Sequence, residues 1–332
     1  MSPCMCSPPI SVRIRRFFES LYLILGLYFT SFFTLDAYTA AQNSPFNVAN
    51  PTNRSNTRAR WHDCIMSTPG SNAEWETLIS KVAETLENTR LEQRTSVTSN
   101  LNRTIDHTQL ALAATEEQID ELCAQALKYQ FVTVCVRLKH VKQAAERLRA
   151  APDVGVACVV GFHEGMYETL EKEQEARAAV ELGATELDMV LKYPLLKNRQ
   201  YTDIYEDVIG VRNAAPAPVL LKVILETSQL SREEIIAGSV ISCLAGADYI
   251  KTSTGFQGGG ATVENVALMS QIAGLLGKGC KVKASGGIRS AADCVKMLQA
   301  GADRIGASSG VKIIQEVNGE EQSEPGVASG AY

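Results

Sequence analysis

Lys251 is the residue of this chain whose type and position most strongly suggest chemistry. It ends the short apolar run Ala-Asp-Tyr-Ile-Lys at 247–251, and the small residues Thr-Ser-Thr-Gly follow at once. Burial at the end of a strand removes water from an ammonium group and favours the neutral amine. A neutral amine can attack a carbonyl carbon and form a Schiff base, whereas most lysines at strand ends are simply solvated. The position alone leaves both interpretations open.

An internal repeat places a carboxylate at a position that matches Lys251. Three similar segments end at Asp188, Lys251 and Gly306, and each carries a glycine five residues before its end. Such a glycine suits the left-handed conformation that closes a helix. Equal offsets from three helix ends predict that these residues lie at similar heights. In an α/β barrel that height is near the carboxyl ends of the strands, where the chemistry is found.

A second lysine follows on the next expected strand, in the run Lys-Val-Lys-Ala-Ser-Gly-Gly-Ile-Arg at 281–289. Strand alternation puts Lys281 and Lys283 on one face. If Lys283 points inward, its charge and the loss of water both lower the pKa of the Lys251 amine. Asp188 would then balance the remaining charge and relay protons. The alternative is a surface Lys283 and an Asp188 that only caps the end of its strand.

Two loops of small residues predict an anion site. They are Gly-Gly at 286–287 and Gly-Ala-Ser-Ser at 306–309. Small residues let backbone N–H groups approach an anion, and a helix that begins just beyond adds partial positive charge. Barrel enzymes commonly hold phosphate after strands seven and eight. Arg289 either adds charge there or lies along the following helix, and tight turns alone are the alternative for both loops.

Three further residues are weaker candidates. Asp106 either hydrogen-bonds a substrate hydroxyl or caps a turn after the first strand. Lys222 lies midway along an apolar strand, where an unpaired charge is costly, so we expect it to pair inside the barrel with a carboxylate such as Asp188. Cys135 suits the core better than it suits nucleophilic catalysis, because the sequence places no histidine beside it.

These residues are carried by a regular series of short apolar runs, each separated from the next by enough chain for a helix and two loops. Eight such strand–helix units predict a (β/α)₈ TIM barrel, and a doubly wound open sheet is the alternative fold. The expected strands are 101–106, 131–136, 155–160, 185–191, 218–225, 247–251, 280–284 and 303–306.

The helices between the strands have sequence signals of their own. The pairs Thr115/Gln118 and Ser231/Glu234 fit capping boxes. One helix carries an apolar stripe, which predicts the face that packs on the barrel. The residues of this stripe are Ile119, Leu122, Cys123, Ala126 and Leu127.

An additional helix is expected before the barrel. Asn72 can cap it, and its apolar residues recur at helical spacing. This stripe predicts that the helix lies against the body of the domain. It consists of Trp75, Leu78, Ile79, Val82 and Leu86.

Composition restricts the class of protein. Of 332 residues, 45% are hydrophobic and 21% charged, which is ordinary for a globular protein. The net charge of −5 provides no general attraction for nucleic acid. Nine cysteines without a CxxC pair indicate a reducing compartment and no structural zinc, and four scattered histidines make a His-built metal site unexpected. We therefore expect no metal and no cofactor.

The chain ends differ in composition from the expected barrel, 72–315. Residues 1–41 have basic residues before a short apolar run, and this pattern is typical of a secretory signal or a signal anchor. A mistranslated or alternative 5′ leader is the other interpretation. The apolar run is short for a membrane span. Residues 42–71 are polar and aperiodic, as in a disordered linker, and 316–332 are expected to form a flexible tail.

The motifs resemble those of the deoxyribose-phosphate aldolase family, which are class I aldolases. The resemblance covers roughly residues 72–315. It rests on the sequences at 105–108, 134–136, 160–162, 186–190, 221–227, 250–256, 283–289 and 306–309.

This resemblance implies that Lys251 forms the Schiff base and that Asp188 and Lys283 are the proton donor/acceptor pair. It also implies reversible cleavage of 2-deoxy-D-ribose 5-phosphate to acetaldehyde and D-glyceraldehyde 3-phosphate in deoxyribonucleoside breakdown. We expect a small phosphorylated sugar as the only kind of ligand, a cytoplasmic location and a possible homodimer. The candidate substrate-binding residues are Asp106, Cys135, Lys222, Thr252, Gly255, Gly286, Gly287, Gly306, Ser308 and Ser309.

The chain departs from the family pattern in three loops after strands one to three. Residues 109–112 replace the usual Leu-Leu-Lys-Pro, Arg137-Leu138 replaces Asn-Pro, and His163-Glu164 replaces a proline. Two alternative functions follow from these changes. One is a phosphate-binding barrel that has lost catalysis, and the other is an imine-forming aldolase for a different sugar phosphate.

Overall fold

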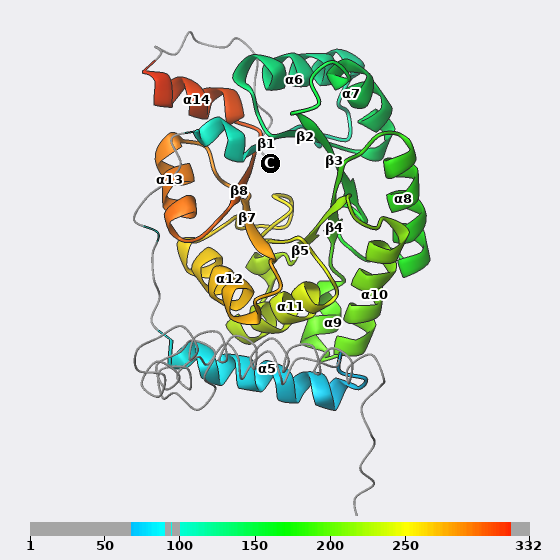
Figure 1. The fold of residues 1–332 in the computed structure, drawn as a ribbon, viewed down its shortest axis with the longest axis vertical. Coiled ribbons are helices and arrows are strands. Elements are labelled where there is room, and N and C mark those ends of the chain that lie inside the picture. The colour runs from blue at the N-terminus through cyan, green and yellow to red at the C-terminus, as the bar shows by residue number, and fades with distance from the viewer. Residues whose placement is uncertain (1–67, 90–93, 95–99, 320–332) are drawn as a thin grey trace, which may run out of the picture. The chain divides into compact units, whose positions relative to one another are not determined.

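The computed structural model describes residues 68–89, 94 and 100–319. They contain a closed barrel of parallel strands in which each strand pairs with the next and β8 pairs with β1 (Figure 1). The predicted (β/α)₈ barrel is confirmed, and the open-sheet alternative is excluded by the β1–β8 pairing. The strands are β1 (Ile105–Thr108), β2 (Thr133–Val136), β3 (Gly155–Val160), β4 (Glu186–Val190), β5 (Leu220–Ile224), β6 (Tyr249–Lys251), β7 (Lys281–Ser285) and β8 (Arg304–Ala307).

Helices surround the barrel on the outside (Figure 1). Most of them connect one strand to the next, and short 3₁₀ helices precede β1 (Leu101–Thr104) and follow β2 (Leu138–His140) and β5 (Thr227–Gln229). The α-helices are α5 (Asn72–Glu87), α6 (Glu116–Tyr129), α7 (Val141–Leu148), α8 (Thr169–Glu181), α9 (Tyr193–Lys197), α10 (Tyr201–Ala214), α11 (Arg232–Leu244), α12 (Val263–Leu276), α13 (Ala291–Gln299) and α14 (Gly310–Asn318).

The helix termini follow local sequence signals. Both predicted capping boxes form, at Thr115 on α6 and at Ser231 on α11. The expected cap of α5 was wrong by one residue: the Ser71 hydroxyl accepts the Glu74 N–H, while the Asn72 side chain accepts the Thr202 N–H at 2.9 Å. Both residue types can cap, so a contact with another helix decides between neighbours.

Two other local expectations are corrected. The first strand begins at Ile105, because residues 101–104 form a 3₁₀ helix. Polar side chains hold this turn: Asn102 donates to the Tyr129 carbonyl at 3.0 Å and Arg103 donates to the Phe131 carbonyl at 3.2 Å. On α6 the predicted stripe is buried except for Leu127, which is 42% exposed at the edge of the packed face.

The strands are buried on both faces, as is usual for parallel sheets covered by helices. Outward residues such as Leu187 and Ile250 are apolar and fully buried. Inward residues are largely charged, and the pairing brings them together: Asp188 is level with Lys222, and Lys251 is level with Lys283. The barrel therefore encloses charged side chains in addition to an apolar cluster that includes Val159, Val190 and Ile224, whereas branched apolar layers are the rule in this fold.

The glycines that close α8, α11 and α13 have the predicted left-handed conformation. The φ angles of Gly183, Gly246 and Gly301 are 106°, 88° and 113°. These repeated helix ends deliver β4, β6 and β8 into the barrel at equivalent points. They explain why Asp188 and Lys251 enter the same region of the interior.

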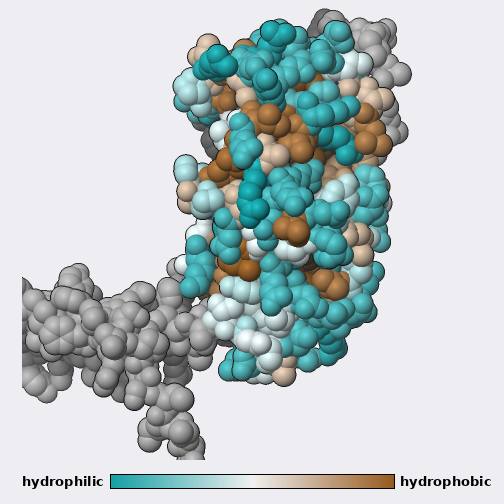
Figure 2. All heavy atoms as spheres, turned by 90° about the vertical axis from the view of Figure 1, so that its right-hand side faces the viewer, coloured by the Kyte–Doolittle hydropathy of each residue, from teal (hydrophilic) through white to brown (hydrophobic). Residues whose placement is uncertain are grey.

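The outer surface over α8 and α10 is mostly hydrophilic, with separate apolar patches (Figure 2). In the described part of the chain no helix combines the length and apolar character needed to cross a membrane. The expected leader at 1–41 lies outside the described residues. So do residues 42–67 of the expected linker and 320–332 of the expected tail.

The additional helix α5 packs on α10, α11 and α12 along its predicted stripe. Trp75 is fully buried, and its ring centroid lies 5.5 Å from that of Tyr205 on α10. We predict that Trp75→Ala lowers the free energy of unfolding by about 3–5 kcal/mol, since it removes a large buried side chain. Glu84→Ala, at an exposed position of the same helix, should change it little, and urea unfolding of both variants measures the difference. Equal stability of both variants would mean that α5 is dispensable to the domain.

Candidate active site

A cluster of buried charges occupies the barrel interior below the carboxyl ends of the strands. Among the described residues it contains three carboxylates and four basic groups, none more than 6% exposed. Each has at least one partner of opposite charge within 4 Å. The members are Asp106, Glu186, Asp188, Lys222, Lys251, Lys283 and Arg304.

Asp188 is the centre of this cluster. Its Oδ2 lies 2.7 Å from the Nζ of Lys251 and 2.6 Å from the Nζ of Lys283. Its Oδ1 lies 2.5 Å from the Nζ of Lys222, so the Lys222–Asp188 pair expected from the sequence forms. Burial alone would raise the pKa of Asp188, but the three ammonium groups outweigh it and hold that pKa well below its ordinary value. Asp188 is therefore a carboxylate across the physiological pH range.

The three lysines differ in how many carboxylates they contact. Lys283 has a second partner in Asp106 at 2.5 Å, and Lys222 has two more in Glu186 at 2.7 Å and Asp106 at 3.8 Å. These extra carboxylates overcome burial and raise the pKa of both lysines.

Lys251 has Asp188 as its one ion-pair partner among the described residues. Burial lowers the pKa of Lys251, and the nearby Lys283 charge lowers it further against the opposing effect of Asp188. A neutral Lys251 also leaves three carboxylates facing three cations, so the buried cluster becomes electrically balanced. Both effects favour the free amine that a Schiff base requires.

Asp106 lies deeper than expected. It is fully buried, with Oδ1 2.7 Å from Arg304 and Oδ2 2.5 Å from Lys283. Instead of capping a turn or facing a substrate hydroxyl, it joins Lys283 to the base of the barrel. Its partner Arg304 also contacts Glu186 at 3.3 Å. This chain of ion pairs holds Lys283 protonated beside Lys251.

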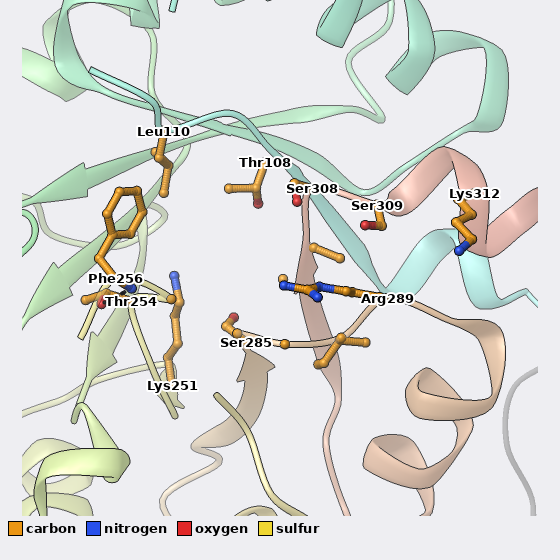
Figure 3. Close-up of a pocket in the computed structure, with 16 residues that line it drawn as sticks. Thr108, Leu110, Lys251, Thr254, Phe256, Ser285, Arg289, Ser308, Ser309 and Lys312 are labelled. Carbon is orange, nitrogen blue, oxygen red and sulfur yellow. Dashed lines mark hydrogen bonds between the residues drawn. The ribbon is translucent and has the colours of Figure 1, made fainter. Parts of the chain in front are cut away.

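A pocket of about 360 Å³ opens above the cluster, at the carboxyl ends of the strands (Figure 3). Of the three interior lysines, Lys251 alone reaches its wall within the described chain. The loops after β6, β7 and β8 supply most of the wall. The lining residues are Thr108, Leu110, Lys251, Thr254, Gly255, Phe256, Ser285, Gly286, Gly287, Ile288, Arg289, Gly306, Ala307, Ser308, Ser309 and Lys312.

One side of the pocket is suited to an anion. Gly286 and Gly287 have φ angles of 88° and 74°, which a side chain would strain. Small residues continue after β8, where α14 begins at Gly310. The side chains of Arg289 and Lys312 lie on this side, away from Lys251 (Figure 3). Backbone N–H groups, a helix start and two cations can together bind a phosphate.

The opposite side of the pocket is apolar: Leu110 and Phe256 line it, and the loops that depart from the family pattern pack around these two residues. The ring centroid of Phe256 lies 5.1 Å from Phe162 and 5.2 Å from His163. Arg137 lies 5.0 Å above the Phe162 ring and donates from Nε to the Leu110 carbonyl at 2.7 Å. Two of the altered loops thus meet through Arg137, and the third packs against Phe162 and Phe256 through His163.

The predicted residues fall into two groups. Lys251, the glycines and the two serines of the substrate-binding set line the pocket, whereas Asp106, Asp188, Lys222 and Lys283 lie buried beneath it. Cys135 belongs to the apolar cluster with Leu110 and Phe162. The Thr252 hydroxyl is used between strands, where it donates to the Ser285 carbonyl at 2.9 Å and accepts the Ser285 N–H at 3.0 Å.

Sequence reasoning missed several residues of the wall. Thr108 and Ser285 each stand two residues after a predicted inward residue, so strand alternation contained a signal for both. Lys312 gave none, because only the direction of α14 brings it to the pocket. The missed residues are Thr108, Leu110, Thr254, Phe256, Ser285, Ile288 and Lys312.

Comparison with known proteins identifies the family. The model of the DeoC/LacD aldolase family matches residues 101–330. The chain belongs to the DeoC/LacD family of aldolases. This DeoC/LacD aldolase is thus a lyase that acts on carbon–carbon bonds.

Several relatives carry the name deoxyribose-phosphate aldolase. One from Coccidioides immitis (strain RS) is 54% identical over 248 residues, 74% of this chain and 92% of the relative. One from Natranaerobius thermophilus is 48% identical over 217 residues, 65% of this chain and 97% of the relative.

A solved structure described as a putative deoxyribose-phosphate aldolase from Coccidioides immitis superposes on this DeoC/LacD aldolase with a TM-score of 0.72. It is 53% identical and covers 75% of this chain and 98% of its own. A deoxyribose phosphate aldolase from Aeropyrum pernix, described as tetrameric, has a TM-score of 0.60 at 35% identity. The match covers 66% of this chain and 91% of that chain.

We predict that Asp188→Asn lowers the free energy of unfolding at pH 7 by about 3–5 kcal/mol, because three buried ammonium groups lose their shared counter-charge. The lowered pKa of Asp188 means that the carboxylate stabilises the fold above its ordinary pKa of about 4 and that this contribution is lost on acidification. The gap between wild type and variant should therefore narrow below pH ~4. Urea unfolding across pH measures it, with the exposed Asp153→Asn as control, and a gap independent of pH would contradict the argument.

Proposed function

We propose that this aldolase reversibly cleaves 2-deoxy-D-ribose 5-phosphate to acetaldehyde and D-glyceraldehyde 3-phosphate, through a Schiff base on Lys251, in deoxyribonucleoside breakdown. The observation that carries the mechanism is the position of Lys251 at the pocket wall, with a lowered pKa and, within the described part of the chain, a single carboxylate partner. The names of the relatives support the choice of substrate.

Imine formation uses the free amine of Lys251. Its nitrogen attacks the C1 aldehyde carbon of the open-chain sugar, and loss of the former carbonyl oxygen as water leaves an imine. That oxygen must gain protons before it can leave. Lys283 is a suitable acid because Asp106 and Asp188 keep it protonated, and Asp188 contacts both lysines through one oxygen. We assign Asp188 and Lys283 as the proton donor/acceptor pair.

Bond cleavage uses the imine as an electron sink. The imine nitrogen carries a proton at this stage. The C3 hydroxyl gives its proton to the Asp188–Lys283 pair, the C2–C3 bond breaks, and its electron pair moves through C2 to the protonated imine nitrogen, which becomes the neutral enamine nitrogen. D-Glyceraldehyde 3-phosphate leaves, and an enamine stays on Lys251. Protonation at C2 and hydrolysis of the imine then release acetaldehyde and restore the amine. The buried ion pairs around Asp188 let the Asp188–Lys283 pair give and take protons without adding net charge to the barrel interior.

The phosphate of the substrate would bind at the other end of the pocket. Gly286 and Gly287, together with Ser308 and Ser309, offer backbone N–H groups there, and Lys312 contributes a cation from the first turn of α14. Holding the phosphate fixes the direction in which the sugar chain runs from Lys251. This positioning presents the C2–C3 bond to the imine end of the site.

We also propose a cellular location, an oligomeric state and a domain organisation for the protein. We place the enzyme in the cytoplasm on the grounds of its cysteine usage, with residues 1–41 as a secretory or membrane-tethering leader in the alternative. We propose a homodimer, and a domain organisation in which 72–315 forms the catalytic domain, with a linker at 42–71 and a tail at 316–332.

Schiff-base trapping tests the nucleophile directly. In the presence of acetaldehyde and borohydride we expect reduction of the imine to leave an ethyl group on Lys251, which peptide mass spectrometry locates. Lys251→Leu should abolish both the label and the cleavage of 2-deoxyribose 5-phosphate. Lys281→Leu, which changes a lysine at the opposite end of the neighbouring strand, should retain both. A Lys251→Leu enzyme that kept full activity and was still labelled would overturn the mechanism.

Removing a cation from the phosphate side should affect phosphorylated substrates selectively. Since Lys312 is about half exposed, Lys312→Ala is expected to raise the KM for 2-deoxyribose 5-phosphate by roughly fivefold, equivalent to about 1 kcal/mol. The kcat/KM for unphosphorylated 2-deoxyribose should stay unchanged. Added salt should shrink the difference by screening. The exposed Lys278→Ala is the matched control, and an equal loss on both substrates would argue against a phosphate contact.

A further inference from the structure

Ser285 has a buried hydroxyl that nothing in the mechanism uses. The residue is 5% exposed and lines the pocket, and its Oγ has no hydrogen-bond partner among the described residues. Figure 3 shows this oxygen directed into the pocket, on the side of β7 that faces Lys251. A hydroxyl withdrawn from water without a partner costs free energy. An unpaired hydroxyl at a pocket wall therefore indicates that a group of the ligand provides its hydrogen-bond partner.

The surrounding backbone fixes this hydroxyl in place. The Ser285 N–H and carbonyl both bond the Thr252 side chain, which ties β7 to the loop after β6. On its other side Ser285 is level with Gly306 of β8. A Cβ added at Gly306 would lie 2.3 Å from the Ser285 Oγ, so only glycine leaves space for the hydroxyl there. The position of Ser285 is thus set by both neighbouring strands.

The order of residues along β7 indicates which group of the substrate faces the Ser285 hydroxyl. Lys283 belongs to the proposed reacting end, and Gly286 begins the proposed phosphate loop. Ser285 lies between them, one inward position above Lys283, or about 6–7 Å along the strand. In 2-deoxyribose 5-phosphate the C4 hydroxyl lies between the carbon whose bond breaks and the phosphate. The C3 hydroxyl must lose its proton and so belongs with the acid–base pair below.

We propose that Ser285 binds the C4 hydroxyl of the sugar phosphate, which is the C2 hydroxyl of D-glyceraldehyde 3-phosphate in the reverse reaction, and so selects acceptor aldehydes that carry it. This rests on the proposed function, since it uses the same pocket and substrate. The hydroxyl group can donate to and accept from the substrate hydroxyl. A site built for such a bond discriminates against an analogue that lacks the hydroxyl, because the Ser285 group is then left unpaired.

The test compares two acceptors in the addition of acetaldehyde. One is D-glyceraldehyde 3-phosphate, and the other is 3-oxopropyl phosphate, which has the same chain and phosphate without the hydroxyl. Ser285→Ala should lower kcat/KM for the first acceptor roughly three- to tenfold, the range for a lost neutral hydrogen bond. It should leave kcat/KM for the second within about twofold of wild type, since that acceptor never makes the bond. Labelling of Lys251 by acetaldehyde and borohydride should be unaffected.

Ser242→Ala provides the matched control. Ser242 is fully buried on α11 with a hydroxyl that also has no partner among the described residues, and it is not part of the pocket wall. This variant should leave both acceptors unchanged. Equal losses on both acceptors in Ser285→Ala would assign Ser285 a structural role and overturn the inference, as would no loss on either. A wild-type enzyme that added acetaldehyde to neither acceptor would instead overturn the proposed function.

Discussion

The structure depends on one carboxylate shared by three ammonium groups inside a closed barrel. Asp188 contacts Lys222, Lys251 and Lys283 at distances of 2.5–2.7 Å with no exposure to solvent. Charges withdrawn from water in this way are tolerated only when each is paired, so the positions of the lysines are constrained by Asp188 and by one another. The barrel supplies the pairing through its register, which sets Asp188 level with Lys222 and Lys251 level with Lys283. Fold and reactivity are therefore linked through the same few contacts.

The distribution of carboxylates explains why three similar lysines take different roles. A lysine with two or more carboxylate partners keeps its proton, as the raised pKa values of Lys222 and Lys283 indicate. Lys251 shares its one carboxylate with both of the others and also lines the pocket. Proton loss from Lys251 removes the surplus positive charge of the cluster, whereas proton loss from Lys283 would leave two carboxylates facing fewer cations. The lower pKa of Lys251 thus follows from its having one or two ion pairs fewer than the other lysines, and no unusual conformation of Lys251 is needed.

The sequence predicted the parts of this arrangement that local pattern determines. Strand spacing indicated the barrel, and the glycines before Asp188 and Lys251 indicated their common level. The closure of the barrel, by contrast, brings together residues that are far apart in the chain. No local sequence pattern predicts these contacts. Arg304 and Glu186 show this: they lie on β8 and β4, which do not pair with each other, yet their side chains contact across the interior at 3.3 Å. Thr252 shows a second limit: it follows Lys251 directly in the sequence, yet its hydroxyl bonds a neighbouring strand, because its side chain points that way.

The altered loops at the apolar side of the pocket show how a departure from a family pattern can leave the chemistry in place. Two of the altered loops meet where Arg137 donates to the Leu110 carbonyl, and Arg137 also covers Phe162. In the third altered loop, His163 stacks on Phe256, a residue of the unaltered loop after β6. None of these side chains ion-pairs with the lysines or carboxylates of the interior among the described residues, so their replacement leaves the charge balance around Lys251 unchanged. Their common effect is on the shape of one wall. A barrel that had lost catalysis would require a change in the charged cluster, and the altered residues lie outside that cluster.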